Sequence, residues 1–150
     1  MVETSSTSAK TAPAWQGIHH VALVTPNLDA TISFYQDVVG MTLLFVAPAG
    51  DMHGRHAGLH AGGNFVGLHF FEMPNAQIFA PPDLSTMHWL PGALHHISIA
   101  LPDEAAGLAF QKRLEAHGIT MTPIMDQGDL WNMVFLDHNG MMVEAAWPKP

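Results

Sequence analysis

The order of apolar and polar residues repeats along the chain at a spacing of 76 residues. Residues 18–23 read Ile-His-His-Val-Ala-Leu and residues 94–99 read Leu-His-His-Ile-Ser-Ile, a pattern typical of a strand. Each copy continues with a proline turn whose Asn or Asp can cap a helix, and then with an amphipathic segment that stops at Gly40 or Gly118. Each half of the chain is therefore predicted to begin with a strand and a helix.

Beyond each predicted helix, the apolar periodicity changes from 3.6 residues to short runs between glycine-rich turns. Such runs are typical of strands. They comprise residues 41–47, about 55–61 and 64–73 in the first half, and residues 119–124, 130–137 and 141–147 in the second. The pattern predicts an α+β fold made of two tandem βαβββ modules.

Composition divides the chain into four segments. Residues 1–14 are rich in Ser, Thr, Ala and Pro and are expected to form a disordered tail. The modules are predicted over residues 15–75 and 93–150, with an ordered, proline-containing linker over residues 76–92. Because a module of roughly 60 residues is marginal alone, the two are expected to pack as one structural domain.

Charge and residue usage argue against several classes of partner. The chain has 13 acidic and 5 basic residues and a net charge of −8, which argues against nucleic acid and anionic membranes as partners. The absence of cysteine excludes disulfides and thiolate-bound metals. Because 48% of residues are hydrophobic and only 12% charged, part of the surface is expected to be covered in a homodimer. No signal or membrane segment is recognisable, so a cytoplasmic location is expected.

Three segments carry a resemblance to a known family: IHHVALVTPNLDATISFYQDVVGM, LHHISIALPD and VFLDHNGMMVEAAW. They resemble the openings of both halves and the closing hairpin of the vicinal oxygen chelate superfamily, which includes glyoxalase I, extradiol dioxygenases and bleomycin-binding proteins. The resemblance covers about residues 17–148 and implies a curved mixed sheet around a metal or ligand cavity. The closing turn, residues 137–141, departs from the family by lacking its proline and containing His138.

The resemblance implies metal ligands on the first and last strand of each half. Carried over residue by residue, they are His20, His96 and Glu144, and the repeat adds His69, which lies 75 residues before Glu144. Glu72 is the alternative to His69, although alternation along a strand directs it to the opposite face. Such a set suits a divalent first-row ion, with Fe(II) expected and Zn, Ni, Co or Mn as alternatives. Taken singly, each histidine is better explained as an ordinary core or strand-end surface residue, but three histidines and a glutamate on repeat-related positions favour metal binding.

Other histidines and Glu144 are candidates for proton transfer. His56 and His60 share a strand face and could line the cavity as acid or base groups. The resemblance to the glyoxalase and epimerase branches implies that Glu144 could leave the metal to act as a base. His19 and His95 are expected to point away from the cavity and to serve packing or an interface.

The favoured function is an extradiol-type dioxygenase acting on a neutral or aromatic substrate, because Arg and Lys are scarce. One alternative is a lyase or isomerase of the glyoxalase I or epimerase type that works by metal-assisted proton transfer. Another is a metal-free binding protein of the drug-resistance type. The small-molecule site could form within one chain, or across a dimer in which one subunit supplies His20 and His69 and the other His96 and Glu144.

Overall fold

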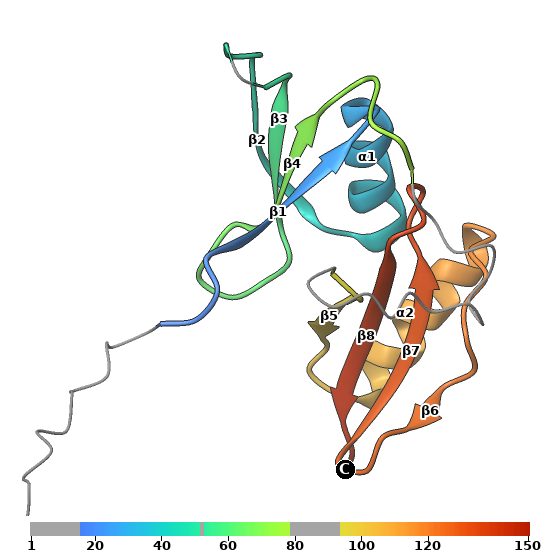
Figure 1. Ribbon diagram of the computed structural model, residues 1–150. Coiled ribbons are helices and arrows are strands. Elements are labelled where there is room, and N and C mark those ends of the chain that lie inside the picture. Colours follow the sequence, from blue (N-terminus) through green and yellow to red (C-terminus); the bar gives the residue numbers. More distant parts are fainter. Residues whose placement is uncertain (1–15, 52, 79–93) are drawn as a thin grey trace, which may run out of the picture.

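The structure, a computed structural model, describes residues 16–51, 53–78 and 94–150 (Figure 1). The predicted tail and most of the predicted linker lie outside these residues. None of the helices in the described ranges is long and apolar enough to cross a membrane.

The first half forms a four-stranded sheet with one helical segment. The elements are β1 (His20–Thr25), α1 (Leu28–Ser33), η1 (Phe34–Val39), β2 (Thr42–Ala47), β3 (His56–His60) and β4 (Gly67–Glu72). The order is β1-β4-β3-β2, with β1 parallel to β4 and the other neighbours antiparallel. Asn27 caps α1 by accepting from the Ala30 N–H, and the helix continues as the π-helix η1 until Gly40, whose φ of 87° suits glycine.

The second half repeats this arrangement. Its elements are β5 (Ile97–Ala100), α2 (Glu104–Ala116), β6 (Met125–Asp126), β7 (Leu130–Leu136) and β8 (Met142–Pro148), in the sheet order β5-β8-β7-β6. The predicted α+β fold of paired βαβββ units is confirmed. The strand expected over residues 119–124 is wrong in position, since only Met121 forms an isolated bridge and β6 begins at Met125. Pro123 interrupts the predicted strand because it has no N–H to donate.

The two halves of the chain meet through helices and a turn. Tyr35 of η1 donates to the Asp137 carboxylate at 2.9 Å, and the Thr31 hydroxyl lies 2.9 Å from His138 Nε2 in the turn between β7 and β8. Arg113 of α2 donates to backbone carbonyls at the end of η1. Burial raises the pKa of both Tyr35 and Asp137, which favours their protonated forms. The unusual His138 in the closing turn thus has a structural contact between the halves.

The core lies between each sheet and its helix. The opposite face of each sheet is therefore the one that can carry a functional site. Trp147 of β8 is 2% exposed and packs on α2 where Gly107 leaves room, because a Cβ there would stand 2.5 Å from the indole. In Figure 1, α2 lies behind β7 and β8. Side chains alternate along a strand, so Glu144 lies on the face away from α2.

Candidate metal centre

In the second half, His96 and Glu144 meet on the sheet face away from α2. Ser98 of β5 is the register partner of Glu144 in β8, and His96, two residues earlier, belongs to the same face. His96 Nε2 lies 2.9 Å from Glu144 Oε2, and Asn132 of β7 donates its Nδ2 hydrogen to Glu144 Oε1 at 2.8 Å. Both oxygens of the Glu144 carboxylate are therefore engaged.

The first half builds the same arrangement from histidines. Ala22 of β1 is the register partner of His69 in β4, and the rings of His20 and His69 have centroids 5.5 Å apart. His56 Nδ1 of β3 lies 2.7 Å from His69 Nε2. Partial burial, followed by the charges of neighbouring histidines including His56 and His20, lowers the pKa of His69, so the imidazole is neutral at pH 7.

The two arrangements correspond position by position. His20 corresponds to His96, His69 to Glu144, and His56 to Asn132, at the offsets of the sequence repeat. One hydrogen bond corresponds as well, because His56 contacts His69 as Asn132 contacts Glu144, whereas His20 and His69 are neighbours through their rings only. The equivalence extends the repeat from backbone to side-chain contacts.

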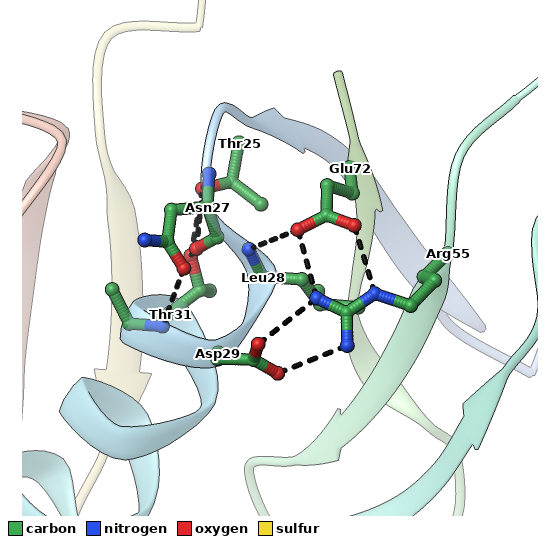
Figure 2. Close-up of polar contacts among 8 residues, drawn as sticks. Thr25, Asn27, Leu28, Asp29, Thr31, Arg55 and Glu72 are labelled. Atoms are coloured by element: carbon green, nitrogen blue, oxygen red, sulfur yellow. Dashed lines mark hydrogen bonds and ion pairs between the residues drawn. The ribbon is translucent and has the colours of Figure 1, made fainter. Parts of the chain in front are cut away.

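Glu72, the alternative to His69, is engaged on the other face of the first sheet. Figure 2 shows its carboxylate accepting from the Leu28 N–H at the start of α1 and from Arg55, which also pairs with Asp29. The Arg55 contacts, with the Leu28 bond, lower the pKa of Glu72, and the same carboxylates raise the pKa of Arg55. The position of Glu72 agrees with the strand alternation expected from the sequence.

The histidines that precede His20 and His96 do not simply point away. His19 Nδ1 lies 2.8 Å from His20 Nδ1, and His95 Nδ1 lies 2.7 Å from His96 Nδ1. The expectation that His19 and His95 serve packing or an interface, rather than metal binding, stays a prediction, and each of them also contacts the candidate ligand that follows it. Since one nitrogen of each pair must donate and the other accept, the contact restricts the ring orientation and tautomer of the candidate ligand.

His56 and His60 have separate environments. His56 is directed at His69, whereas His60 Nδ1 lies 2.9 Å from the Phe65 carbonyl and the residue lines a cavity of about 350 Å³ between the halves. His53, also close in sequence, has its ring centroid 4.9 Å from that of His56. The first sheet thus gathers His20, His53, His56 and His69, while His60 stands apart.

A second cavity of about 520 Å³ adjoins His96 and Glu144. Besides His96 and Glu144, four apolar and three uncharged polar residues line it. The apolar ones are Met125, Leu130, Val134 and Met142, and the polar ones are Thr122, Gln127 and Asn132. An apolar cavity with a few converging polar groups is the usual form of a small-molecule site.

Within the described part of one chain, the candidate ligands remain two pairs. No group of three His, Asp or Glu residues there is placed to hold one ion. Each pair by itself has fewer donors than the four that the sequence predicts.

Comparison with protein families identifies the fold. The model of the Glyoxalase/Bleomycin resistance protein/Dioxygenase superfamily matches residues 17–145, which is most of the chain. The chain belongs to this superfamily. Superfamily members often use divalent metals, and three imidazoles with one carboxylate fit such an ion.

Solved structures of the superfamily share the fold over nearly the whole chain. The glyoxylase/bleomycin resistance protein/dioxygenase domain from Frankia sp. EAN1pec has a TM-score of 0.71 at 20% identity, covering 91% of this chain and 94% of that one. Lactoylglutathione lyase from Agrobacterium tumefaciens has a TM-score of 0.63 at 21% identity, with 90% and 96% covered. TnmS3, an antibiotic binding protein from Streptomyces sp. CB03234, has a TM-score of 0.66 at 18% identity, with 92% and 100% covered. Curated proteins gave no match.

Proposed function

We propose that this superfamily member is a metal-dependent lyase or isomerase that moves a proton on a small molecule with two adjacent oxygens. The observation that carries the proposal is the equivalence of the two half sites, which gives His69 the place opposite Glu144. A set of His20, His69, His96 and Glu144 then has one carboxylate that can leave an ion while three imidazoles retain it.

The roles of the chain's own groups follow from their contacts. When bound, the ion supplies Lewis-acid stabilisation of negative charge on the substrate oxygens. Glu144 accepts a proton at Oε2 from the carbon beside those oxygens and returns it to the product, while Oε1 stays with Asn132. The cavity beside Glu144 offers a place for a small substrate next to this carboxylate, against four apolar side chains.

An extradiol-type dioxygenase is the second candidate, and the contact between His56 and His69 favours it. In this candidate His69 Nε2 keeps its 2.7 Å contact with His56 when the ion is bound, so the donors are His20, His96 and Glu144. Two imidazoles and one carboxylate are the set that oxygen-activating Fe(II) enzymes use. The two candidates thus differ in whether His69 binds the ion.

We infer that the four donors come together across a homodimer. Ile18 and Leu94 occupy equivalent positions just before β1 and β5, and they are 77% and 51% exposed. Both line a groove of about 610 Å³ that also includes His96. A two-fold symmetric dimer that buries this apolar surface would place the first half of each subunit beside the second half of its partner. The dimer would then contain two equivalent sites.

The charges of the described residues favour an uncharged substrate. Arg55 is paired with Glu72 and Asp29, and Arg113 donates to backbone carbonyls. Lys149 pairs with Asp126 and lies over Trp131, on the face of β7 opposite Asn132. Lys112 is exposed on α2. No Lys or Arg among the described residues lines the cavity beside Glu144, so a carboxylate or phosphate would be buried there without a partner.

Two chelating probes test this substrate class. Benzohydroxamic acid is expected to bind the Zn²⁺-loaded protein at least about tenfold more tightly than 4-carboxybenzohydroxamic acid, because the extra carboxylate has no cation in the cavity. Isothermal titration of both probes measures the ratio. A Gln127→Lys variant, which adds a cation to the cavity wall, should reduce the preference. Equal or tighter binding of the carboxylated probe by the wild type would refute an uncharged substrate.

A further inference from the structure

The structure assigns to Asn132 the role of a positioning residue that holds Glu144 in the orientation needed for metal binding. This inference deepens the proposed function and rests on it. Asn132 lies in the middle of β7 and is 6% exposed, and it lines the same cavity as His96 and Glu144. Neither composition nor the family resemblance assigns it a role.

The chemistry of the contact fixes which way the amide points. An ionised carboxylate only accepts hydrogen bonds, so the amide must present Nδ2 to Glu144 Oε1. Asn132 Oδ1 is then left buried without a hydrogen-bond partner. Leaving a buried acceptor unpaired costs free energy. The amide keeps this arrangement because the alternative orientation would direct its oxygen at the carboxylate.

The contact occupies one carboxylate oxygen and turns the other toward His96, the neighbouring candidate ligand. With Oε1 held by Asn132, Oε2 is the atom that meets His96 at 2.9 Å. The ion and the transferred proton are therefore both expected at Oε2. An amide does not titrate at physiological pH, so Asn132 retains this bond whether or not Glu144 carries a proton.

The first half supports the assignment independently. His56 occupies the position equivalent to Asn132 and contacts His69, the equivalent of Glu144, at 2.7 Å. Two different side chains thus provide the same kind of contact at the same place in each module. Groups that hydrogen-bond to metal ligands orient those ligands, and their loss typically costs about 10–100-fold in metal affinity.

Co²⁺ titration tests the assignment. Asn132→Leu, which keeps the branching at Cγ but removes the donor, is expected to weaken Co²⁺ binding by about 10–100-fold and to change the visible spectrum of the bound ion. Asn132→His restores a donor of the kind found at His56 and is expected to recover most of the affinity. Asn64→Ala, at an exposed position, is the matched control and should bind as the wild type does.

The outcomes separate this inference from the proposed function. If Asn132→Leu fails to fold by circular dichroism, Asn132→Ala, which removes the donor without adding a charge or a metal-binding group, replaces it and should show the same loss. Unchanged affinity and spectrum in the folded variant would overturn the role of Asn132 alone. A wild-type protein that does not bind Co²⁺ would overturn the proposed metal site and this inference together.

Discussion

A heterodimer of one His20→Ala subunit and one Glu144→Ala subunit is expected to keep one intact metal site, although each variant alone forms none. If each site takes His20 and His69 from one subunit and His96 and Glu144 from its partner, both substitutions fall in one of the two sites. The second site then retains all four donors. The purified heterodimer should therefore bind Zn²⁺ tightly at about half the wild-type capacity. Competition with a chelator measures this capacity, with the two subunits carrying different histidine-free tags.

A second heterodimer provides the control. When His20→Ala is paired with His69→Ala, both changes lie in the first half, so each shared site loses one donor and no tight site should remain. If the first heterodimer also has no tight site while the wild type has one per chain, each site forms within a single chain, and the inferred dimer arrangement is wrong.

Replacing His69 is expected to disrupt metal binding, whereas replacing Glu72 is not. His69 lies beside His20, but Glu72 is engaged with Arg55 and the start of α1 on the other face. His69→Ala should weaken Zn²⁺ binding by more than the roughly 10–100-fold typical of an outer-shell partner. Glu72→Gln should bind Zn²⁺ as the wild type does but unfold at lower urea concentration. The same chelator competition and a urea titration give both results.

The stability effect of Glu72→Gln should depend on pH. The contacts with Arg55 and Leu28 lower the pKa of Glu72 below 4.5, so its contribution is present above that pH and is lost as the pH falls through the folded-state pKa. The difference between the two proteins should thus be seen at neutral pH and narrow in acid.

The metal affinities of these two variants also decide whether His69, Glu72 or neither of them is the fourth ligand. Lost binding in Glu72→Gln would make Glu72 the fourth ligand. Unchanged binding in His69→Ala would leave a three-donor set and favour the dioxygenase candidate.

The fold could be predicted from the sequence because the same pattern of local structural preferences occurs in both halves of the chain. A strand, a capped helix and a terminating glycine in each half are encoded by nearby residues, and they appear at Asn27 and Gly40 as expected. Strand alternation likewise separates Glu72 from His69, because alternation needs no knowledge of neighbouring strands. Both predictions depend on local geometry alone.

The side-chain contacts between neighbouring strands could not be predicted from the sequence and are seen only in the structure. The bond between Asn132 and Glu144 depends on the register of β7 against β8, which the residue pattern does not specify. A signal was nevertheless present, since the repeat offset that relates His20 to His96 also relates His56 to Asn132. The contact between Thr31 and His138 had no such signal, because a histidine in a turn is equally compatible with a structural or a chemical role.

Elemental analysis of the protein, purified without a histidine tag under anaerobic conditions, tests the central claim most directly. We expect about one divalent transition-metal ion per chain, bound through the set that includes His96 and Glu144. Zinc, nickel or cobalt would support the lyase or isomerase, and iron would support the dioxygenase. A protein that contains no such ion and takes up none on reconstitution would contradict the metal site and leave a metal-free binding protein as the function.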